Sequence, residues 1–315
     1  MSDLPDRRLL LVHAHPDDET IGQGVTMAKY VRDGAHVTLV TCTGGEEGEI
    51  LVPELEHLAS DREDRLAEHR RIELAEAMRI LGVTDHRFLG GFGAYRDSGM
   101  VWHDEGHAVA GEHIHPGAFW GADLTAAAND LVEVIREVRP QVLVCYDEFG
   151  GYGHPDHIQA HRVAMYAAQL AAVPSYRREL GEAWDIPKIY WGAMPESRMR
   201  AGLRAIRAAG DTTSFEGLDP DGPLPRFITP DADVTTVVAD ETLVDTKLAA
   251  LRAHATQVTT DGPFFALSDN SGQQAWAAEY FRIVKGEAVP DPEGGDDPDV
   301  DGQLETDLFA GLTAD

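Results

Sequence analysis

Nearly continuous apolar runs alternate with longer amphipathic segments along the first part of the chain. The runs at 9–14, 37–42 and 142–146 are rich in Val and Leu, which is typical of parallel strands that are covered on both faces. Residues 124–138 instead carry apolar side chains at helical spacing, and Asp123 stands in the N-cap position. Strands and helices that alternate in this way predict an α/β fold, with a Rossmann-like, doubly wound, mostly parallel sheet and a smaller C-terminal lobe.

The pattern weakens after about residue 190, and this change divides the chain into four predicted parts. Residues 1–190 form the Rossmann-like core, and residues 191–285 form a lobe that completes the site of that core. Residues 286–303 are mostly Pro, Gly, Asp and Glu with almost nothing to bury, so we expect a disordered acidic segment. Residues 304–315 form a C-terminal tail.

A helix predicted at 61–81 has an apolar stripe that two charged residues, Arg70 and Glu73, interrupt. Such a stripe normally faces the core of a protein. Two explanations are open. The two residues form an ion pair that the sheet half covers, or Arg70 projects past the sheet edge to hold a polar substrate while Glu73 orients it.

The charge balance disfavours two classes of partner. Asp and Glu outnumber Lys and Arg by 55 to 26, and the formal net charge is −29. Nucleic acids and anionic membranes are bound by concentrated Lys and Arg, so we expect neither as a partner. Salt adaptation or a solubility device explains the acidity equally well.

The sequence also favours a cytoplasmic location. It has no export signal at its N-terminus and no apolar run that approaches about 18 residues, the length of a membrane helix. Cys42 and Cys145 both lie in predicted core strands, which fits reduced cysteines rather than a disulfide framework.

Ionisable residues gather directly after two of the predicted strands. VHAHPDDE at 12–19 belongs to the first strand and its end, and YDEFGGYGHPDHIQAH at 146–161 belongs to the third. Because the carboxyl ends of parallel strands meet at one edge of a sheet, we expect both His-Pro-Asp turns in one crevice. The turns contribute the following ionisable residues: His15, Asp17, Asp18, His154, Asp156 and His157.

Two neutral imidazoles and a carboxylate are the ligand set of a catalytic divalent metal, with positions left open for water and substrate. Zinc is the leading candidate, and ferrous iron is the second. The proline after His15 fixes a bend, so that Asp17 and Asp18 point in different directions and one of them is free to move protons. His154 and His157 are three residues apart on the next predicted helix and share a face, so one can ligate while the other stands over the substrate.

Other histidines and the glycine-rich turns carry weaker signals. The His-rich stretch 103–115 lacks the H-E-x-x-H order of a zinc-binding helix, and we predict a mobile loop over the crevice. His161 is either a competing ligand or a group behind the site. TGGEEGE at 43–49 and GGFG at 90–93 lack the full G-x-G-x-x-G spacing of a dinucleotide site, so we expect turns that let a substrate approach the backbone.

Several motifs together resemble the LmbE-like (PIG-L) family of zinc-dependent N-acetylglucosamine deacetylases. They are AHPDDE at 14–19, TGGEEGE at 43–49, RRIE at 70–73, GGYGHPDH at 150–157 and RAHATQ at 252–257. LGGFGAYRDSGM at 89–100 and ETDLFAGL at 305–312 are similar to one actinobacterial branch, whose members deacetylate N-acetylglucosaminyl-inositol in mycothiol biosynthesis. The resemblance implies a small amino-sugar inositol substrate, and it leaves the oligomeric state open.

The resemblance also implies roles for single residues. His15, Asp18 and His157 correspond to the metal ligands of the family, and Asp17 corresponds to its general base. His154 corresponds to a general acid that protonates the leaving amine and helps to stabilise the oxyanion.

Four further roles follow from the same resemblance. Asp156 would orient the imidazole of His154, and Tyr152 would reach the developing oxyanion. Arg70 and Asp97 would bind sugar and inositol hydroxyls, which favours the substrate-holding explanation of the charged helix stripe.

Two other functions stay open at this stage. The sister branch, mycothiol S-conjugate amidase, uses the same metal set on a different amide, and we expect a proline there in place of Gly153. A noncatalytic sugar- or nucleotide-binding Rossmann module would keep the glycine turns, but it would not need Asp17 beside a complete ligand set.

Overall fold

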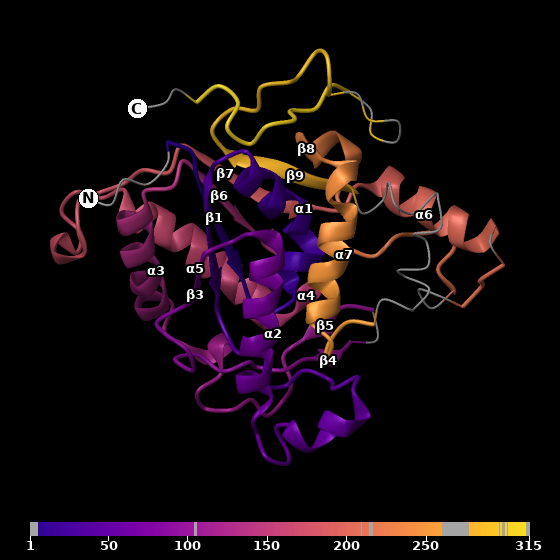
Figure 1. Cartoon of the computed structure of the whole chain (residues 1–315), viewed down its shortest axis with the longest axis horizontal. Helices are drawn as coiled ribbons and strands as arrows, with labels where there is room; N and C mark the ends of the chain where they lie inside the picture. Colours follow the sequence, from indigo (N-terminus) through magenta and orange to yellow (C-terminus); the bar gives the residue numbers. More distant parts are fainter. Residues whose placement is uncertain are drawn as a thin grey trace.

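One seven-stranded sheet runs through the centre of the protein, in the order β3-β2-β1-β6-β7-β9-β8 (Figure 1). The computed structural model describes residues 6–103, 106–208, 210–213, 217–259, 277–295, 297, 300 and 302–312. The strands are β1 (Arg8–His13), β2 (His36–Thr41), β3 (Asp85–Phe88), β6 (Val142–Cys145), β7 (Lys188–Ala193), β8 (Thr236–Ala239) and β9 (Ala278–Lys285). The strands from β3 to β7 are parallel, and β9 and β8 pair antiparallel at the far edge. The predicted mostly parallel α/β sheet is confirmed.

Helices cover both faces of this sheet (Figure 1). They are α1 (Asp18–Arg32), α2 (Leu66–Leu81), α3 (Leu124–Val138), α4 (Gly150–Gly153), α5 (Pro155–Ala171), α6 (Glu196–Ala208) and α7 (Val244–Ala253). Leu10 and Val12 of β1 pack against α3 and α5, whereas Leu9 and Leu11 pack on the side of α1, α2 and α7. Because side chains alternate along a strand, one apolar run fills both cores.

Helix α3 begins where the sequence predicts, whereas α2 begins later. α3 begins directly after Asp123, whose Oδ1 accepts the Ala126 N–H at 2.8 Å, as predicted. α2 begins at Leu66, several residues later than the pattern indicated. The reason lies at Asp64, whose φ of 52° is left-handed and interrupts a right-handed helix.

The C-terminal part of the chain continues the central sheet. The predicted boundary at 190/191 falls inside β7, and β9 pairs with both β7 and β8. The described part of 286–303 is not the disordered segment that we expected. Val289 N–H donates to Glu305 Oε1 at 3.0 Å, Asp291 N–H donates to the Leu304 carbonyl at 3.0 Å, and Val300 is buried. These bonds compensate for the low apolar content of the segment.

A buried carboxylate ties the C-terminal tail to the sheet. Glu305 is fully buried and accepts hydrogen bonds from Lys188 Nζ at 2.5 Å and Tyr190 OH at 2.6 Å. Thr236 Oγ1 adds a third bond at 2.9 Å. Strands β7 and β8 therefore both hold the tail through one side chain.

Replacing Glu305 with Gln is expected to destabilise the protein by about 3–5 kcal/mol, because it leaves the ammonium of Lys188 buried without a counter-charge. The free energy of urea unfolding measures the effect. The control is Asp221→Asn, since Asp221 and Arg204 pair at 2.7 Å with side chains 75% and 56% exposed. Loss of that exposed pair should cost less than about 1 kcal/mol. Equal costs for the two variants would contradict the prediction.

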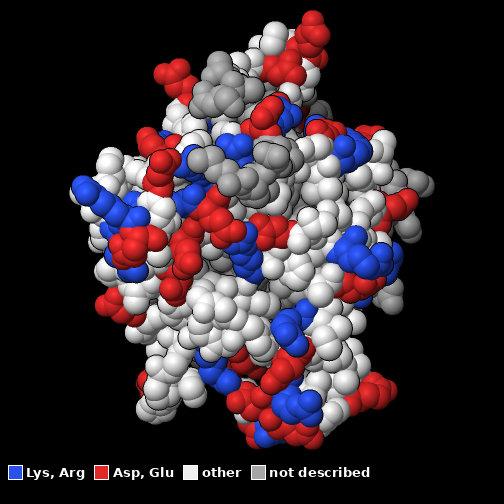
Figure 2. Space-filling view, turned by 60° about the vertical axis from the view of Figure 1, so that its left-hand side comes forward, with Lys and Arg blue, Asp and Glu red and all other residues white. Residues whose placement is uncertain are grey.

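The described helices include none that is long and apolar enough to cross a membrane. On the face in Figure 2, acidic side chains form several groups with Lys and Arg among them, and a broad uncharged surface lies between. The described residues of this face form no continuous basic stripe of the kind that binds nucleic acid.

Candidate functional site

The candidate site lies where the strand order of the sheet reverses. β1 continues through β2 to β3 on one side, whereas β6 lies on the other side of β1 and continues to β7. Ligands of open α/β sheets bind at the carboxyl ends of the strands at such a point. His15 follows β1, and the GGYGHPDH turn follows β6, so neighbouring strands bring the two His-Pro-Asp turns together.

Three donor atoms form an almost equilateral triangle at this edge. His15 Nδ1, Asp18 Oδ2 and His157 Nε2 are each 3.3 Å from the other two. Ligand atoms about 2.05 Å from a tetrahedral zinc ion lie about 3.3 Å apart, so the donor set and its spacing fit such an ion. His15 and His157 are buried.

Outer contacts orient each of these donors. His157 Nδ1 lies 3.2 Å from the Gly150 carbonyl oxygen, and His15 Nε2 lies 3.3 Å from Asp156 Oδ2. An N–H donated outward leaves the other ring nitrogen with its lone pair toward the triangle. Asp18 Oδ2 accepts a hydrogen bond from the Tyr146 hydroxyl at 2.8 Å, and this bond orients the carboxylate.

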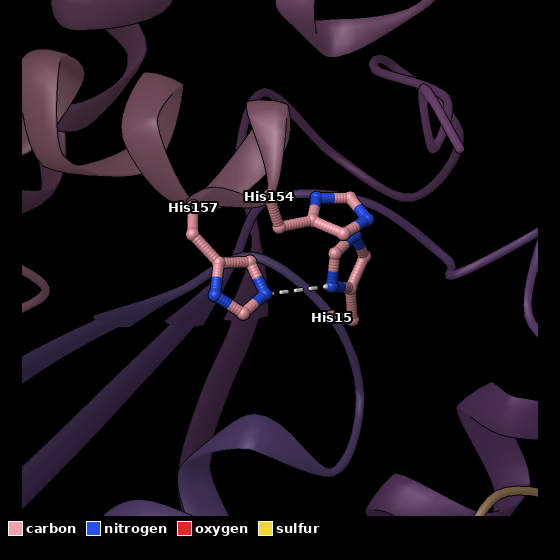
Figure 3. A group of neighbouring side chains, drawn as sticks. All are labelled: His15, His154 and His157. Carbon is pink, nitrogen blue, oxygen red and sulfur yellow. Dashed lines mark hydrogen bonds between the residues drawn. The ribbon is translucent and has the colours of Figure 1, made fainter. Parts of the chain in front are cut away.

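His154 is the third imidazole of the site. In Figure 3, His154 and His157 extend from the start of one helix, His15 comes from a separate loop, and the rings lie close together. The centroid of the His154 ring is 4.6 Å from that of His15 and 4.9 Å from that of His157. Burial and the two neighbouring imidazoles lower the pKa of His154 to about 2, so the ring is neutral near pH 7.

The carboxylate of Asp156 has different partners from those expected. We predicted that it would orient His154, but it faces His15 and accepts the Ser98 N–H at 2.8 Å. Ser98 Oγ occupies its other oxygen. His154 Nδ1 instead accepts the backbone N–H of Asp156 at 3.1 Å. Asp156 therefore supports the imidazole of His15, and the backbone of α5 orients the imidazole of His154.

Asp17 stands beside the triangle in a strained conformation. Its φ is 130°, in a range that residues other than glycine rarely adopt. Burial raises the pKa of Asp17 to about 6, although the guanidinium of Arg70, 3.3 Å away, opposes the shift. A carboxylate with a pKa in this range is ionised at neutral pH and still basic enough to accept a proton.

Arg70 contacts backbone carbonyls next to Asp17, and its predicted role in holding a substrate stays a prediction. It is 3% exposed and donates to the carbonyl oxygens of Pro16 at 2.5 Å and Gly45 at 2.8 Å. A Cβ at Gly45 would lie 2.1 Å from Arg70 Nη1, so the arginine side chain requires glycine in this turn. Glu73 is bound to Thr256, so the described contacts support neither explanation of the charged stripe.

Asp97 and Tyr152 lie next to different imidazoles of the site. Asp97 Oδ1 is 3.4 Å from His15 Nε2, and the residue lines a cavity of about 200 Å³. The ring of Tyr152 is 5.1 Å from that of His157 and 5.9 Å from that of Trp102, between centroids. Burial raises the pKa of Tyr152, so its hydroxyl stays protonated.

The other histidines that the sequence singled out are those of the stretch 103–115 and His161. The stretch 103–115, apart from residues 104 and 105, which are outside the described residues, follows β4 (Val101–Trp102) and includes β5 (Ala108–Val109), and these two strands form a small antiparallel sheet. His113 and His115 line the 200 Å³ cavity. His161 Nδ1 lies 3.0 Å from the Tyr146 carbonyl, and its ring packs on Trp191, which places it behind the site.

Comparisons with known proteins fix the family. A family profile described as GlcNAc-PI de-N-acetylase, PIG-L, matches residues 10–168. The chain belongs to the PIG-L family. A relative from Nocardioides sp. named 1D-myo-inositol 2-acetamido-2-deoxy-alpha-D-glucopyranoside deacetylase is 72% identical over 307 residues, 98% of this chain and 99% of that protein.

Solved structures share the fold of this PIG-L chain at low sequence identity. N,N'-diacetylchitobiose deacetylase from Pyrococcus horikoshii superposes with a TM-score of 0.58 at 21% identity, over 89% of this chain and 84% of that one. GalB, a 4-carboxy-2-hydroxymuconate hydratase from Pseudomonas putida, gives 0.59 at 19% identity, over 90% and 99% of the two chains. Since these two names describe different reactions, the fold alone does not determine the chemistry.

One glycine of the PIG-L site allows the small β4–β5 sheet to pack against it. Gly153 has a φ of 96°, and a Cβ there would lie 2.6 Å from the Ala108 carbonyl oxygen. Proline, with φ fixed near about −65°, cannot adopt this conformation. The close approach of β5 therefore requires glycine at this position.

Replacing Gly153 with Ala is expected to cost about 1–2 kcal/mol for the left-handed backbone and about 1–3 kcal/mol more for the contact with Ala108. Gly93→Ala is the matched control, since Gly93 has a φ of 79° and an added Cβ would meet nothing within 4 Å. Urea unfolding of both variants measures the difference. If Gly93→Ala is as damaging as Gly153→Ala, the close approach is not what matters.

Proposed function

We propose that the chain hydrolyses the acetamide of N-acetylglucosaminyl-inositol and releases acetate and glucosaminyl-inositol, a step of mycothiol biosynthesis. Membership of the PIG-L family and the name of the relative that is 72% identical over 98% of this chain support the reaction and the substrate. The observation that carries the proposal is the 3.3 Å triangle of His15 Nδ1, Asp18 Oδ2 and His157 Nε2 beside Asp17.

Zinc is the proposed metal, and ferrous iron is the alternative. His15, Asp18 and His157 would hold it, because two imidazoles and a carboxylate suit either ion. When bound, the ion polarises the acetamide carbonyl and lowers the pKa of water. The noncatalytic binding module is disfavoured, since such a module needs neither this donor set nor a basic carboxylate next to it.

Asp17 acts as the general base. Its carboxylate is ionised at neutral pH because its pKa is about 6. It takes a proton from the attacking water while the water oxygen adds to the acetyl carbon. The C–N bond then breaks, and the amine nitrogen must receive a proton. In this balance one water is consumed, and acetate, the free amine and one proton, which Asp17 returns to the solvent, are formed.

His154 and Tyr152 act on the amine nitrogen and on the carbonyl oxygen of the acetamide. Because His154 starts neutral, it first accepts the second proton of the added water, as negative charge develops on the substrate next to it, and then passes that proton to the amine. The protonated hydroxyl of Tyr152 can donate a hydrogen bond to the developing oxyanion. Asp97 accepts hydrogen bonds from sugar or inositol hydroxyls, and its position at the wall of the 200 Å³ cavity supports this role.

The test is release of free amine from N-acetylglucosaminyl-inositol by the purified protein, before and after chelation and after adding zinc or ferrous iron. We expect turnover that chelation abolishes and one of the metals restores. Absence of both bound metal and turnover would leave the binding module as the better explanation. A preference for a mycothiol S-conjugate under the same conditions would instead indicate the amidase.

A further inference from the structure

The backbone of Asp17 needs external support. A non-glycine residue with a φ of 130° persists only when its surroundings hold it there. Asp17 precedes α1 without capping that helix through its side chain. Its N–H donates to Glu19 Oε2 at 3.0 Å, so a side chain two residues further on holds the strained peptide.

Glu19 is itself held by a residue from the far end of the chain. It is fully buried, and its other oxygen, Oε1, is 3.0 Å from His254 Nε2 and 2.6 Å from Thr20 Oγ1. His254 follows directly after α7 and is also fully buried. Burial alone favours the neutral imidazole, but the Glu19 carboxylate raises the pKa of His254, which strengthens the attraction between the two.

The turn after α7 is fixed independently of this contact. Thr256 donates its N–H at 2.9 Å and its hydroxyl at 2.6 Å to Glu73 of α2. The same helix carries Arg70, which binds the Pro16 carbonyl and lies 3.3 Å from the Asp17 carboxylate. Asp17 is therefore held through its side chain by α2 and through its peptide N–H by Glu19.

One of the two ring nitrogens of His254 gains nothing from its place in the core. Its Nδ1 is buried without a hydrogen-bond partner among the described residues. A buried polar atom without a partner lowers stability, so its retention calls for another explanation. The orientation of the Asp17 carboxylate provides such an explanation.

We propose that His254 and Glu19 are positioning residues, which fix the Asp17 backbone through its N–H and thereby aim the Asp17 carboxylate at the reacting atoms. The inference rests on the proposed function, because Asp17 is the base there. Metal binding should be largely spared, since Asp18 Oδ2 is held separately by Tyr146 OH at 2.8 Å and the His15 N–H at 2.9 Å.

The test compares His254→Ala with His254→Gln, whose amide N–H can take the place of Nε2–H. For the Ala variant we expect kcat to fall by about 10- to 100-fold, as for a group misplaced by about 1 Å, with KM and metal content little changed. The Gln variant should recover most of kcat. Glu19→Ala should add little to His254→Ala, because both act through one hydrogen-bonded chain.

Thr256→Val is the matched control, since it weakens the neighbouring anchor of the same turn but leaves the His254–Glu19 contact. We expect its kcat to stay close to that of the wild type. The inference is overturned if a folded, metal-loaded His254→Ala protein keeps its kcat, or if Ala, Gln and the control all lose it alike.

A crystal structure of His254→Ala gives a readout without activity. We expect the φ of Asp17 to leave the region near 130°. If φ is unchanged, the positioning role is refuted. Failure of the wild-type protein to deacetylate refutes the proposed function instead, and the φ of the variant then still decides whether His254 holds the peptide.

Discussion

Asp17→Asn is expected to retain the divalent metal yet lose about 10²- to 10⁴-fold in kcat, the range typical of a missing general base. The amide has nearly the same shape as the carboxylate, and it can still lie close to Arg70. It cannot accept a proton from water at neutral pH. Steady-state kinetics and metal analysis of the same preparation measure the two effects.

Asp33→Asn, at the far end of α1, controls for the loss of one carboxylate from that helix. It should leave kcat unchanged, because Asp33 is exposed and pairs with Lys29 at 3.0 Å. If Asp17→Asn deacetylates at the wild-type rate, another base must be found. If it loses its metal as well, the role of Asp17 is in binding rather than in proton transfer.

The meeting of the two His-Pro-Asp turns could be predicted because it depends on backbone topology. Apolar runs identify parallel strands, and the rule that their carboxyl ends share an edge brings His15 and His157 together. Polar residues just after such strands are therefore informative even in a single sequence. The side-chain spacing of 3.3 Å between the two imidazole nitrogens required the structure.

The partners of the buried charges could not be predicted in the same way. Helix periodicity indicates that Arg70 and Glu73 face inward, but not which groups meet them there. Their partners, the Pro16 carbonyl and Thr256, are separated from them by 54 and 183 residues in the chain. Side-chain direction and long-range pairing decide such contacts, and neither leaves a periodic trace in the sequence.

Two residues of the proposed positioning contact lie in motifs that the sequence does reveal. Glu19 belongs to AHPDDE and His254 to RAHATQ, and neither residue received a function from residue type or spacing. The contact between them spans 235 positions. Composition gave no sign of the contacts in the described part of 286–303, where a few backbone pairs and one buried valine, Val300, join an otherwise polar stretch to the rest of the protein.

His15→Ala is expected to abolish metal binding itself, in contrast to Asp17→Asn. Changes in the groups that support a ligand typically cost 10- to 100-fold in metal affinity, so loss of the ligand should cost more than about 100-fold. His15 also links the triangle to Asp156, so its removal eliminates one donor and releases the carboxylate behind it. Metal titration of the apoprotein measures the affinity, and activity should disappear in parallel.

Two further variants test whether the effect of His15→Ala is specific. Asp156→Asn keeps all three donors and weakens the support of His15, so its metal affinity should fall by the intermediate amount of about 10- to 100-fold. His57→Ala removes an exposed imidazole whose Nδ1 lies 3.0 Å from the Glu54 carbonyl oxygen, outside the triangle, and should bind metal normally. A His15→Ala protein that is folded and still binds one metal tightly would show that the ion sits elsewhere, because the triangle cannot hold it with only Asp18 and His157.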